Sequence, residues 1–413
     1  MLTVTEAEKI ILELITQQQE SERRWVALEQ ADDQVLAQDL VSLVDFPQWH
    51  SSAMDGYALR YEDIANHWQT IELNIAVTEV KAGSPVALPL KHGEAMRIFT
   101  GGCLPMGADT VVMQEDVEII GDSLRLRTKP VHGEYVRSQG EYLRAGELLV
   151  KQGTRLGGTE IGAIAAAGIG QVQVYRQPRV AIMSTGDELV NLGQPLQVGQ
   201  IWDSNQYALA ALVRRAGAIA IPLGAVPDQP QALKLKMQQA IAEADLVISS
   251  GGVSVGDYDY VDTVLEAIGA EIHIRSVAIK PGKPLTVAKI NDSISQRQVI
   301  YFGVPGNPVS AMVTFWRFIG GAIAKLSGMP ESAWYPQWIK VQTTEDLHAQ
   351  GRRETYLWGQ LSFAKGKPIF QPVQNYSSGN LISVIGVNAL AMMRMHQTYV
   401  PAMDEVMVMI LPY

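Results

Sequence analysis

The chain has 413 residues, of which 47% are hydrophobic and 18% charged, and this predicts a globular protein with several hydrophobic cores. Its formal net charge is -10 and its basic residues are scattered, so we expect no nucleic-acid binding, because this charge repels polyanions. The single cysteine, Cys103, excludes an internal disulfide and a thiolate metal site, and it predicts a cytoplasmic protein.

The first predicted element is an N-terminal helix. Thr5 and Glu8 have the spacing of a capping box at its start. Its opening acids replace the basic region of a signal peptide, and the most apolar later run, 311–326, is interrupted by Arg317 and Lys325. We therefore expect neither a signal peptide nor a membrane span. The apolar face of the helix comprises Ala7, Ile10, Ile11, Leu14 and Ile15.

Along the rest of the chain, the pattern of apolar and turn residues changes three times. Short apolar runs separated by Gly and Pro over 46–149 predict a β-rich domain. A helix of small residues within 157–168 is interpreted as scaffold or as a dimer contact. Residues 179–328 carry continuous apolar runs that end in Gly-rich turns and precede helical stretches, which predicts a parallel α/β sheet. Short strands after residue 328 predict a small C-terminal β domain.

The first loop of the α/β region is STGDEL, residues 184–189. Gly186 permits a tight turn, and Asp187 and Glu188 offer the hard oxygen ligands that magnesium prefers. Taken alone, this segment is better explained as a turn and a helix start. Ligands of open α/β sheets bind at the carboxyl ends of the strands, so this loop should converge with the three loops that follow.

The second loop is SSGGVSVGDYD, residues 249–259. Ser250, Gly251 and Gly252 can present hydroxyl and backbone N–H groups to a phosphate, which favours anion binding over a plain flexible turn. Asp259 would face the same cleft as an acid, a base or a metal ligand.

Two further loops complete the set. AIKPGKP, residues 278–284, fixes its two lysines between prolines, although surface lysines alone indicate little because they are ordinarily solvated. GVPGNPVS, residues 303–310, can approach a ligand closely through its glycines, and its Asn can cap a helix or contact a base edge. In the β-rich region, SSAMDGYA contains Asp55, but a lone Asp-Gly is usually only a turn.

Taken together, these segments resemble the MoeA family of molybdopterin molybdenumtransferases, bacterial relatives of the gephyrin E domain. Six motifs stand in the family's order between residues 51 and 311, and weaker matches continue in QGRRETYLWGQL and YSSGNL. The six motifs are SSAMDGYA, RIFTGGCLPMGADTVVMQE, STGDEL, SSGGVSVGDYDY, IKPGKPL and GVPGNPVSA.

The resemblance implies a multidomain α/β and β fold in an elongated homodimer. It further implies insertion of molybdate into adenylyl-molybdopterin with release of AMP, magnesium as cofactor, and a cleft completed by the partner subunit. The molybdopterin adenylyltransferase is an expected physical partner, and no membrane is involved. The expected divisions are 1–45 with 140–178 as a helical and linker region, 46–139 as the inserted β-rich domain, 179–328 as the α/β domain that binds molybdopterin adenylate, and 329–413 as the C-terminal β domain.

The resemblance also implies roles for individual residues. The catalytic set is Asp55, Thr100, Glu188, Asp228 and Asp259. Magnesium would be held by Glu188, Asp187 and Asp228. The substrate-binding set is Arg137, Gly186, Asp187, Ser250, Gly251, Gly252, Lys280, Gly282, Lys283, Pro305, Gly306, Asn307 and Ser378.

The chain departs from the family pattern at two places. Tyr142 stands where the family often has an acid, and the segment around Arg352 and Arg353 leaves open which arginine contacts ligand.

Two alternative functions also follow from the pattern. The α/β part resembles the adenylyltransferases that make the substrate, although the inserted β domain argues against that reaction. The second alternative is a non-enzymatic, gephyrin-like scaffold, although the sequence supplies no partner-binding tail.

Overall fold

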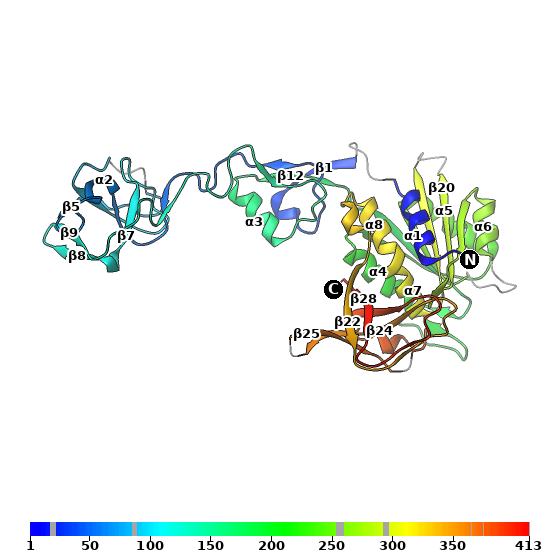
Figure 1. The fold of residues 1–413 in the computed structure, drawn as a ribbon. Coiled ribbons are helices and arrows are strands. Elements are labelled where there is room, and N and C mark those ends of the chain that lie inside the picture. The colour runs from blue at the N-terminus through cyan, green and yellow to red at the C-terminus, as the bar shows by residue number, and fades with distance from the viewer. Residues whose placement is uncertain are drawn as a thin grey trace.

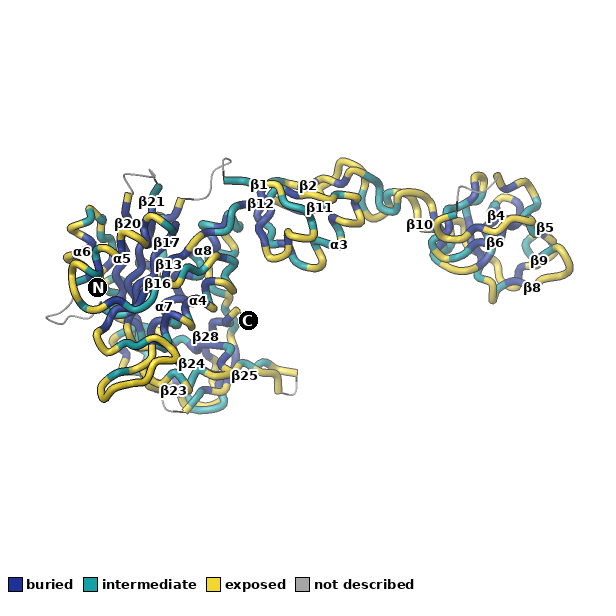
Figure 2. Tube along the Cα trace, turned by 180° about the vertical axis from the view of Figure 1, so that it is seen from behind, coloured by how far each residue is buried: buried dark blue, intermediate teal, exposed yellow. Residues whose placement is uncertain are grey.

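The computed structural model describes residues 1–16, 22–84, 89–252, 260–291, 297–364, 366–374 and 376–412. The molecule is elongated (Figure 1), with a small β body at one end, a slender middle body, and a large body that contains both chain termini. Figure 2 shows that the buried residues concentrate in the large body, around β13, β17 and β21.

The small end body is built on one six-stranded sheet of order β7-β4-β6-β5-β9-β8. Its strands pair antiparallel except β5 and β6, and apolar side chains such as Leu59, Leu73 and Ile98 are fully buried between sheet and loops. The elements are β4 (Gly56–Leu59), α2 (Tyr61–Ile64), β5 (Leu73–Ile75), β6 (Glu94–Ile98), β7 (Thr110–Met113), η3 (Gln114–Asp116), β8 (Val117–Ile120) and β9 (Ser123–Leu126). The predicted β-rich region therefore forms a sheet with its own core.

The middle body is formed where the chain runs out to the small body and returns. Outgoing and returning strands pair antiparallel, so the connection is held at three places along its length. A short helix, α3 (Gly158–Ala166), covers these strands, and its Ile164 is fully buried against Val172 and Val174. The elements are β1 (Arg23–Ala27), η2 (Leu28–Gln30), β2 (Leu40–Val41), β3 (Ser51–Ser52), β10 (Val136–Arg137), β11 (Leu148–Val150) and β12 (Gln171–Tyr175).

The N-terminal helix α1 (Val4–Leu14) packs on the large body through Ala7 and Ile11, as its apolar face predicted. The predicted capping residues were wrong by two positions. Thr3 caps the helix, accepting the backbone N–H of Glu6, while the Glu6 carboxylate accepts the backbone N–H of Thr3. Thr5 already lies in the first turn with helical backbone, so its side chain cannot serve as the cap, which requires a residue just outside the helix.

The α/β part of the large body has three layers. Its six-stranded sheet has the order β16-β13-β17-β21-β20-β18, and the first four strands are parallel as predicted. Two antiparallel strands at one edge were not predicted. The strands are β13 (Arg179–Thr185), β16 (Ile219–Val226), β17 (Leu246–Ser250), β18 (Glu271–Ser276), β20 (Pro284–Asn291) and β21 (Gln298–Val304), with a separate parallel pair, β14 (Leu189–Val190) and β15 (Ile201–Trp202).

Helices cover both faces of this sheet because its strands are apolar on both sides. Val180 and Ile182 of β13 pack against α1, α4 and the helices after β21, whereas Ala181 and Met183 pack against α5 and α6. The helices are α4 (Asn205–Arg215), α5 (Pro230–Glu243), α6 (Val261–Ala267), α7 (Pro308–Thr314) and α8 (Gly320–Leu326), with a π-helical turn, η4 (Phe315–Ile319), between the last two.

The C-terminal part is a six-stranded sheet that curls on itself. Its order is β19-β24-β25-β22-β28-β26, and an additional pairing joins β24 to β26. Its first strand, β19 (Ile279–Lys280), comes from the α/β part, so the two parts share a strand pair. The other elements are η5 (Glu331–Ala333), β22 (Gln337–Thr343), β23 (Leu347–His348), β24 (Glu354–Ala364), β25 (Lys367–Pro372), η6 (Leu381–Val384), β26 (Ala389–Met393), β27 (Tyr399–Val400) and β28 (Glu405–Ile410).

The continuous helical run Pro308–Leu326 is long and apolar enough to cross a membrane by length and composition alone. However, 67% of it is buried inside the fold, against the sheet and α1. Burial of this kind is what a core helix of a globular body shows, and we interpret it as such.

Candidate active site

A cleft of about 1070 Å³ lies between the α/β sheet and the C-terminal sheet. It opens at the carboxyl ends of β13, β17 and β21, where the first, second and fourth predicted loops begin. The predicted residues that line it are Gly186, Glu188, Asp228, Ser250, Gly251, Gly252, Lys280, Gly282, Lys283, Pro305, Gly306, Asn307 and Ser378. The tertiary structure thus brings together loops that lie far apart in the sequence.

Acidic side chains gather at one side of the cleft, near the ends of β13 and β16. Glu188 and Asp228 line the cleft, and the Asp187 carboxylate accepts a hydrogen bond from the backbone N–H of Asp228 at 3.0 Å. None of the three carboxylates has an ion-pair partner among the residues that the structure describes. The pKa of Asp228 is raised, first by burial and then by the negative charges of Asp187 and Glu188.

This raised pKa predicts a pH-dependent effect of Asp228→Asn on stability. Because the folded-state pKa is above the unfolded one, ionised Asp228 opposes folding at neutral pH, and this cost disappears as pH falls through the folded pKa. We expect the variant to melt about a degree or two higher than wild type at neutral pH without divalent cations, with the difference vanishing in acid. Calorimetry across pH measures this, with Glu243→Gln on α5 as control. A lower melting temperature at neutral pH would contradict the inferred repulsion.

The second loop approaches the first closely, and only glycine allows this approach. Gly251 has φ +91°, and a Cβ there would lie 2.4 Å from the backbone oxygen of Thr185. The Asn205 side chain at the start of α4 fixes the neighbouring loops, because its Nδ2 donates to Ser250 Oγ at 2.6 Å and to the Gly306 carbonyl at 2.7 Å. Thr185 is 5% exposed, and its buried Oγ1 lies beneath Gly251 and Gly252 without a hydrogen-bond partner among the described groups.

Cations line the opposite side of the cleft. Lys280 lies on β19 and Lys283 follows it, while Arg353 and Ser378 reach the same space from the C-terminal part. The loop that carries both lysines packs tightly on α7, because a Cβ on Gly282 would lie 2.9 Å from Thr314 Oγ1. The cleft is therefore acidic on one side and basic on the other, with glycine loops between.

Among the described residues, four predicted ones do not line this cleft: Asp187, which lies beside it, and three that lie far from it. Asp55 and Thr100 belong to the small end body and Arg137 to its junction with the middle body, far along the molecule from the cleft of the same chain (Figure 1). Thr100 donates two hydrogen bonds to Asp55 Oδ1, each 2.7 Å long, from its backbone N–H and its hydroxyl. These bonds lower the pKa of Asp55 and hold it ionised. Asp259 lies outside the described residues.

Comparison with known proteins agrees with this architecture throughout the chain. Residues 2–168 match the MoeA N-terminal region (domain I and II), 181–325 a probable molybdopterin binding domain, and 340–411 the MoeA C-terminal region (domain IV). A molybdopterin molybdenumtransferase from Nostoc is 48% identical over 100% of this chain and 94% of its own length. The chain belongs to the MoeA family. A Haemophilus influenzae molybdopterin molybdenumtransferase is 36% identical over 85% of the chain and 84% of its own length.

Solved MoeA structures have the same fold. The molybdopterin biosynthesis MoeA protein from Pyrococcus horikoshii superimposes with a TM-score of 0.83 at 27% identity, covering 99% of this chain and 100% of that chain. The family resemblance and the fold class predicted from the sequence are confirmed by these matches.

Several cleft residues of this MoeA chain were missed by sequence reasoning. Asp203 and Asn205 stand before and at the start of a predicted helix and belong to no candidate loop, and Thr185, although it lies in STGDEL, was not named as a site residue. Asp203 is 1% exposed and accepts Ser184 Oγ at 2.9 Å, so it supports the loop after β13. Of the two arginines that the sequence left open, Arg353 lines the cleft. The aromatic residues Trp358 and Tyr376 line it too, with their rings edge to face at 4.9 Å.

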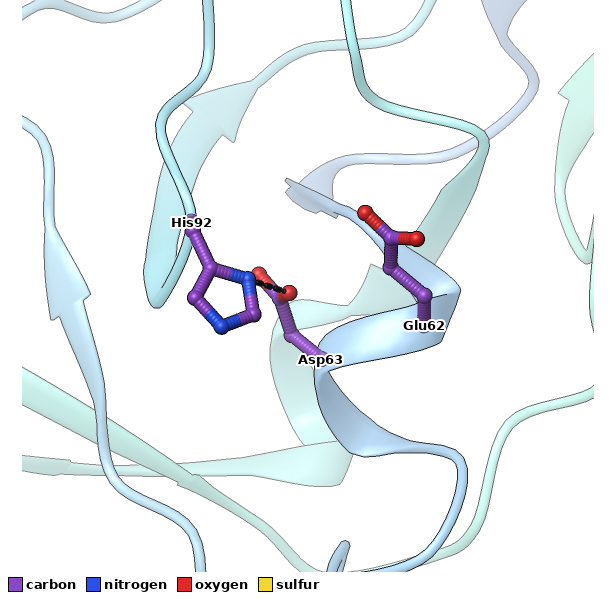
Figure 3. Close-up of side chains that lie close together, drawn as sticks. All are labelled: Glu62, Asp63 and His92. Atoms are coloured by element: carbon purple, nitrogen blue, oxygen red, sulfur yellow. Dashed lines mark ion pairs between the residues drawn. The ribbon is translucent and has the colours of Figure 1, made fainter.

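Figure 3 draws a different group of possible metal ligands, Glu62, Asp63 and His92, in the small end body. Among the described residues this is the one group of three or more His, Cys, Asp or Glu whose ligand atoms all lie within 4.8 Å of one another. Asp63 pairs with His92 and accepts the Gly93 N–H at 2.8 Å, while Glu62 pairs with Arg60. Each carboxylate thus has a partner, and we interpret the group as a tie between α2 and the loop before β6.

The acids predicted to bind magnesium do not form such a compact group. Glu188, Asp187 and Asp228 lie at one side of the cleft, but their carboxylate oxygens do not gather within 4.8 Å in the described structure. The sequence thus predicted which acids lie at the same side of the cleft, but not how far apart their carboxylate oxygens are.

Proposed function

We propose that this chain inserts molybdate into adenylyl-molybdopterin and releases AMP, with magnesium as cofactor. The observation that carries the proposal is the polarity of the cleft, with acids at one side, cations at the other and glycine loops between. Two anionic reactants must meet during this reaction, so their charges need neutralising from both sides. Family membership supports the same reaction, because curated relatives carry the name molybdopterin molybdenumtransferase.

The acidic corner fits magnesium. Mg²⁺ keeps several waters and is usually bound through one or two carboxylates and substrate phosphates, so a complete protein cage is not needed. Glu188 and Asp228 would hold it from the cleft wall, with Asp187 beside them. Bound there, Mg²⁺ would neutralise negative charge at the pyrophosphate.

The protein's own groups account for the rest of the site. The backbone around Gly251, which lines the cleft, would bind the phosphate region. Lys280, Lys283 and Arg353 would attract the molybdate dianion, with Ser378 beside them. A molybdate oxygen held there would attack the adenylate phosphorus and break its phosphoanhydride bond, so that the phosphate of molybdopterin is the leaving group. AMP would then depart with that oxygen, as the Mo–O bond to it breaks and molybdenum binds the two dithiolene sulfurs.

A homodimer completes the proposal. Asp55, Thr100 and Arg137 lie far from the cleft of their own chain, so a second copy must supply them if they act there. The elongated shape supports this arrangement, because the small end body projects away from the large body (Figure 1). We place the dimer in the cytoplasm, with the molybdopterin adenylyltransferase as the partner that delivers substrate.

The proposed reaction predicts AMP release that requires both molybdate and a divalent cation. Purified protein is incubated with adenylyl-molybdopterin and Mg²⁺, with or without molybdate, and AMP is measured by chromatography. Leaving out either molybdate or the cation should abolish AMP release. Equal AMP formation without molybdate would mean that the reaction is hydrolysis and not insertion. Consumption of ATP by the protein with unmodified molybdopterin would instead identify an adenylyltransferase.

A further inference from the structure

A chain of mostly buried polar groups leads from α1 to the basic side of the cleft, which its member Tyr356 helps to line. It begins with Arg317 in the π-helical turn η4, whose side chain is only 7% exposed. One end of the guanidinium, Nη1, pairs with Glu8 of α1, and Nε donates to the Tyr356 hydroxyl on β24 at 3.0 Å. The hydroxyl of Tyr356, a residue 1% exposed, donates in turn to Glu354 Oε1 at 2.6 Å.

The chain ends at the strand pair that carries two of the cleft cations. Glu354 begins β24, and its N–H donates to the Ala278 carbonyl at 2.9 Å, next to β19 with Lys280. Arg353, one residue earlier, donates through Nη1 to the Ile279 carbonyl at 3.2 Å. A displacement of β24 relative to β19 would therefore change the distance between Arg353 and Lys280.

Stability alone does not explain this network. Burying the Arg317–Glu8 pair requires both charges to leave water, and apolar side chains of similar volume usually serve a core as well or better. The guanidinium is also presented by a single turn of π-helix between α7 and α8, and such turns are frequent at functional sites. Neither Glu8 nor Arg317 lines the cleft.

We propose that Glu8 and Arg317, acting through Tyr356 and Glu354, are positioning residues that fix Arg353 and Lys280 relative to each other and so set the affinity of the cleft for molybdate. The assignment of molybdate to this side rests on the proposed function. The positioning of Arg353 and Lys280 does not rest on the proposed function, because it is a property of the ligand-free protein.

The test uses Glu8→Gln and Arg317→Met in the full-length protein. The first is mild and keeps a hydrogen-bonding side chain, so it remains informative if the second destabilises the fold. The control is Arg176→Met, which removes another partly buried arginine, one that pairs with Asp245 and does not line the cleft. Hydrogen–deuterium exchange of the ligand-free proteins should then be faster in peptides covering 278–281 and 352–357 for both network variants and unchanged there for the control. Unchanged exchange in these peptides, or a uniform increase along the chain, overturns the proposal.

Kinetics supply a second readout that general destabilisation does not reproduce. We expect the KM for molybdate to rise about tenfold in both network variants, with the KM for adenylyl-molybdopterin and kcat nearly unchanged. Tyr356→Phe breaks the same chain, so adding it to Glu8→Gln should raise the KM for molybdate by less than the product of the single effects. Equal rises in both KM values, or a loss in kcat alone, count against positioning. Molybdate-independent AMP release by wild type would refute the proposed function. The hydrogen–deuterium exchange result would still show whether Glu8 and Arg317 position the strands that carry Arg353 and Lys280.

Discussion

Replacing Glu188 by Gln is expected to lower kcat for AMP release by about two to three orders of magnitude, because it removes one of the two cleft-lining carboxylates proposed to hold Mg²⁺. The protein should remain folded, since Glu188 is exposed and has no ion-pair partner among the described residues. Steady-state kinetics over a range of Mg²⁺ concentrations measure the effect. The concentration of Mg²⁺ needed for half-maximal activity should rise together with the fall in kcat.

The matched control is Glu29→Gln, an exposed glutamate in the middle body. It changes the net charge by the same amount, so any effect of overall charge on anionic substrates appears in both variants. An activity of Glu188→Gln equal to that of the control would show that the acidic corner does not hold the catalytic cation.

The second large effect concerns the division of the site between two subunits. Asp55→Asn should lower AMP release about a hundredfold, although the asparagine oxygen can still accept both bonds from Thr100. A heterodimer of one Asp55→Asn subunit and one Glu188→Gln subunit should recover about half of the wild-type activity. In such a dimer one cleft combines the intact Glu188 of one chain with the intact Asp55 of the other, while the second cleft contains both substitutions.

The heterodimer is obtained by co-expressing the two variants with different affinity tags and purifying through both tags in turn. Homodimers of each variant, purified in the same way, give the baseline. A heterodimer no more active than the two variant homodimers would mean that Asp55 does not act in the partner's cleft. Light scattering that finds only monomer would contradict the proposed dimer itself.

Local sequence determined most of the elements that build the large body. The runs at 179–184, 219–226, 245–250 and 299–304 became β13, β16, β17 and β21. Three of these strands are buried on both faces, which requires apolar residues at successive positions, whereas β16 is a half-buried edge strand. The loops after all four of these strands contributed cleft residues, because parallel strands end at the same edge of a sheet. Binding loops could therefore be predicted from short motifs.

The tertiary structure decided what depends on partners distant in sequence. Asn205 belongs to no motif, and it contributes to the site only because Ser250 and Gly306 come to lie beside it. Arg353 could be told from Arg352 only once β24 was paired with β19. The sequence by itself determined which strands, loops and charged residues this chain has, because periodicity and turn chemistry are local properties. Which of those residues meet in one cleft, and how far Asp55 lies from it, was decided by the fold, because those distances depend on how whole strands and helices pack.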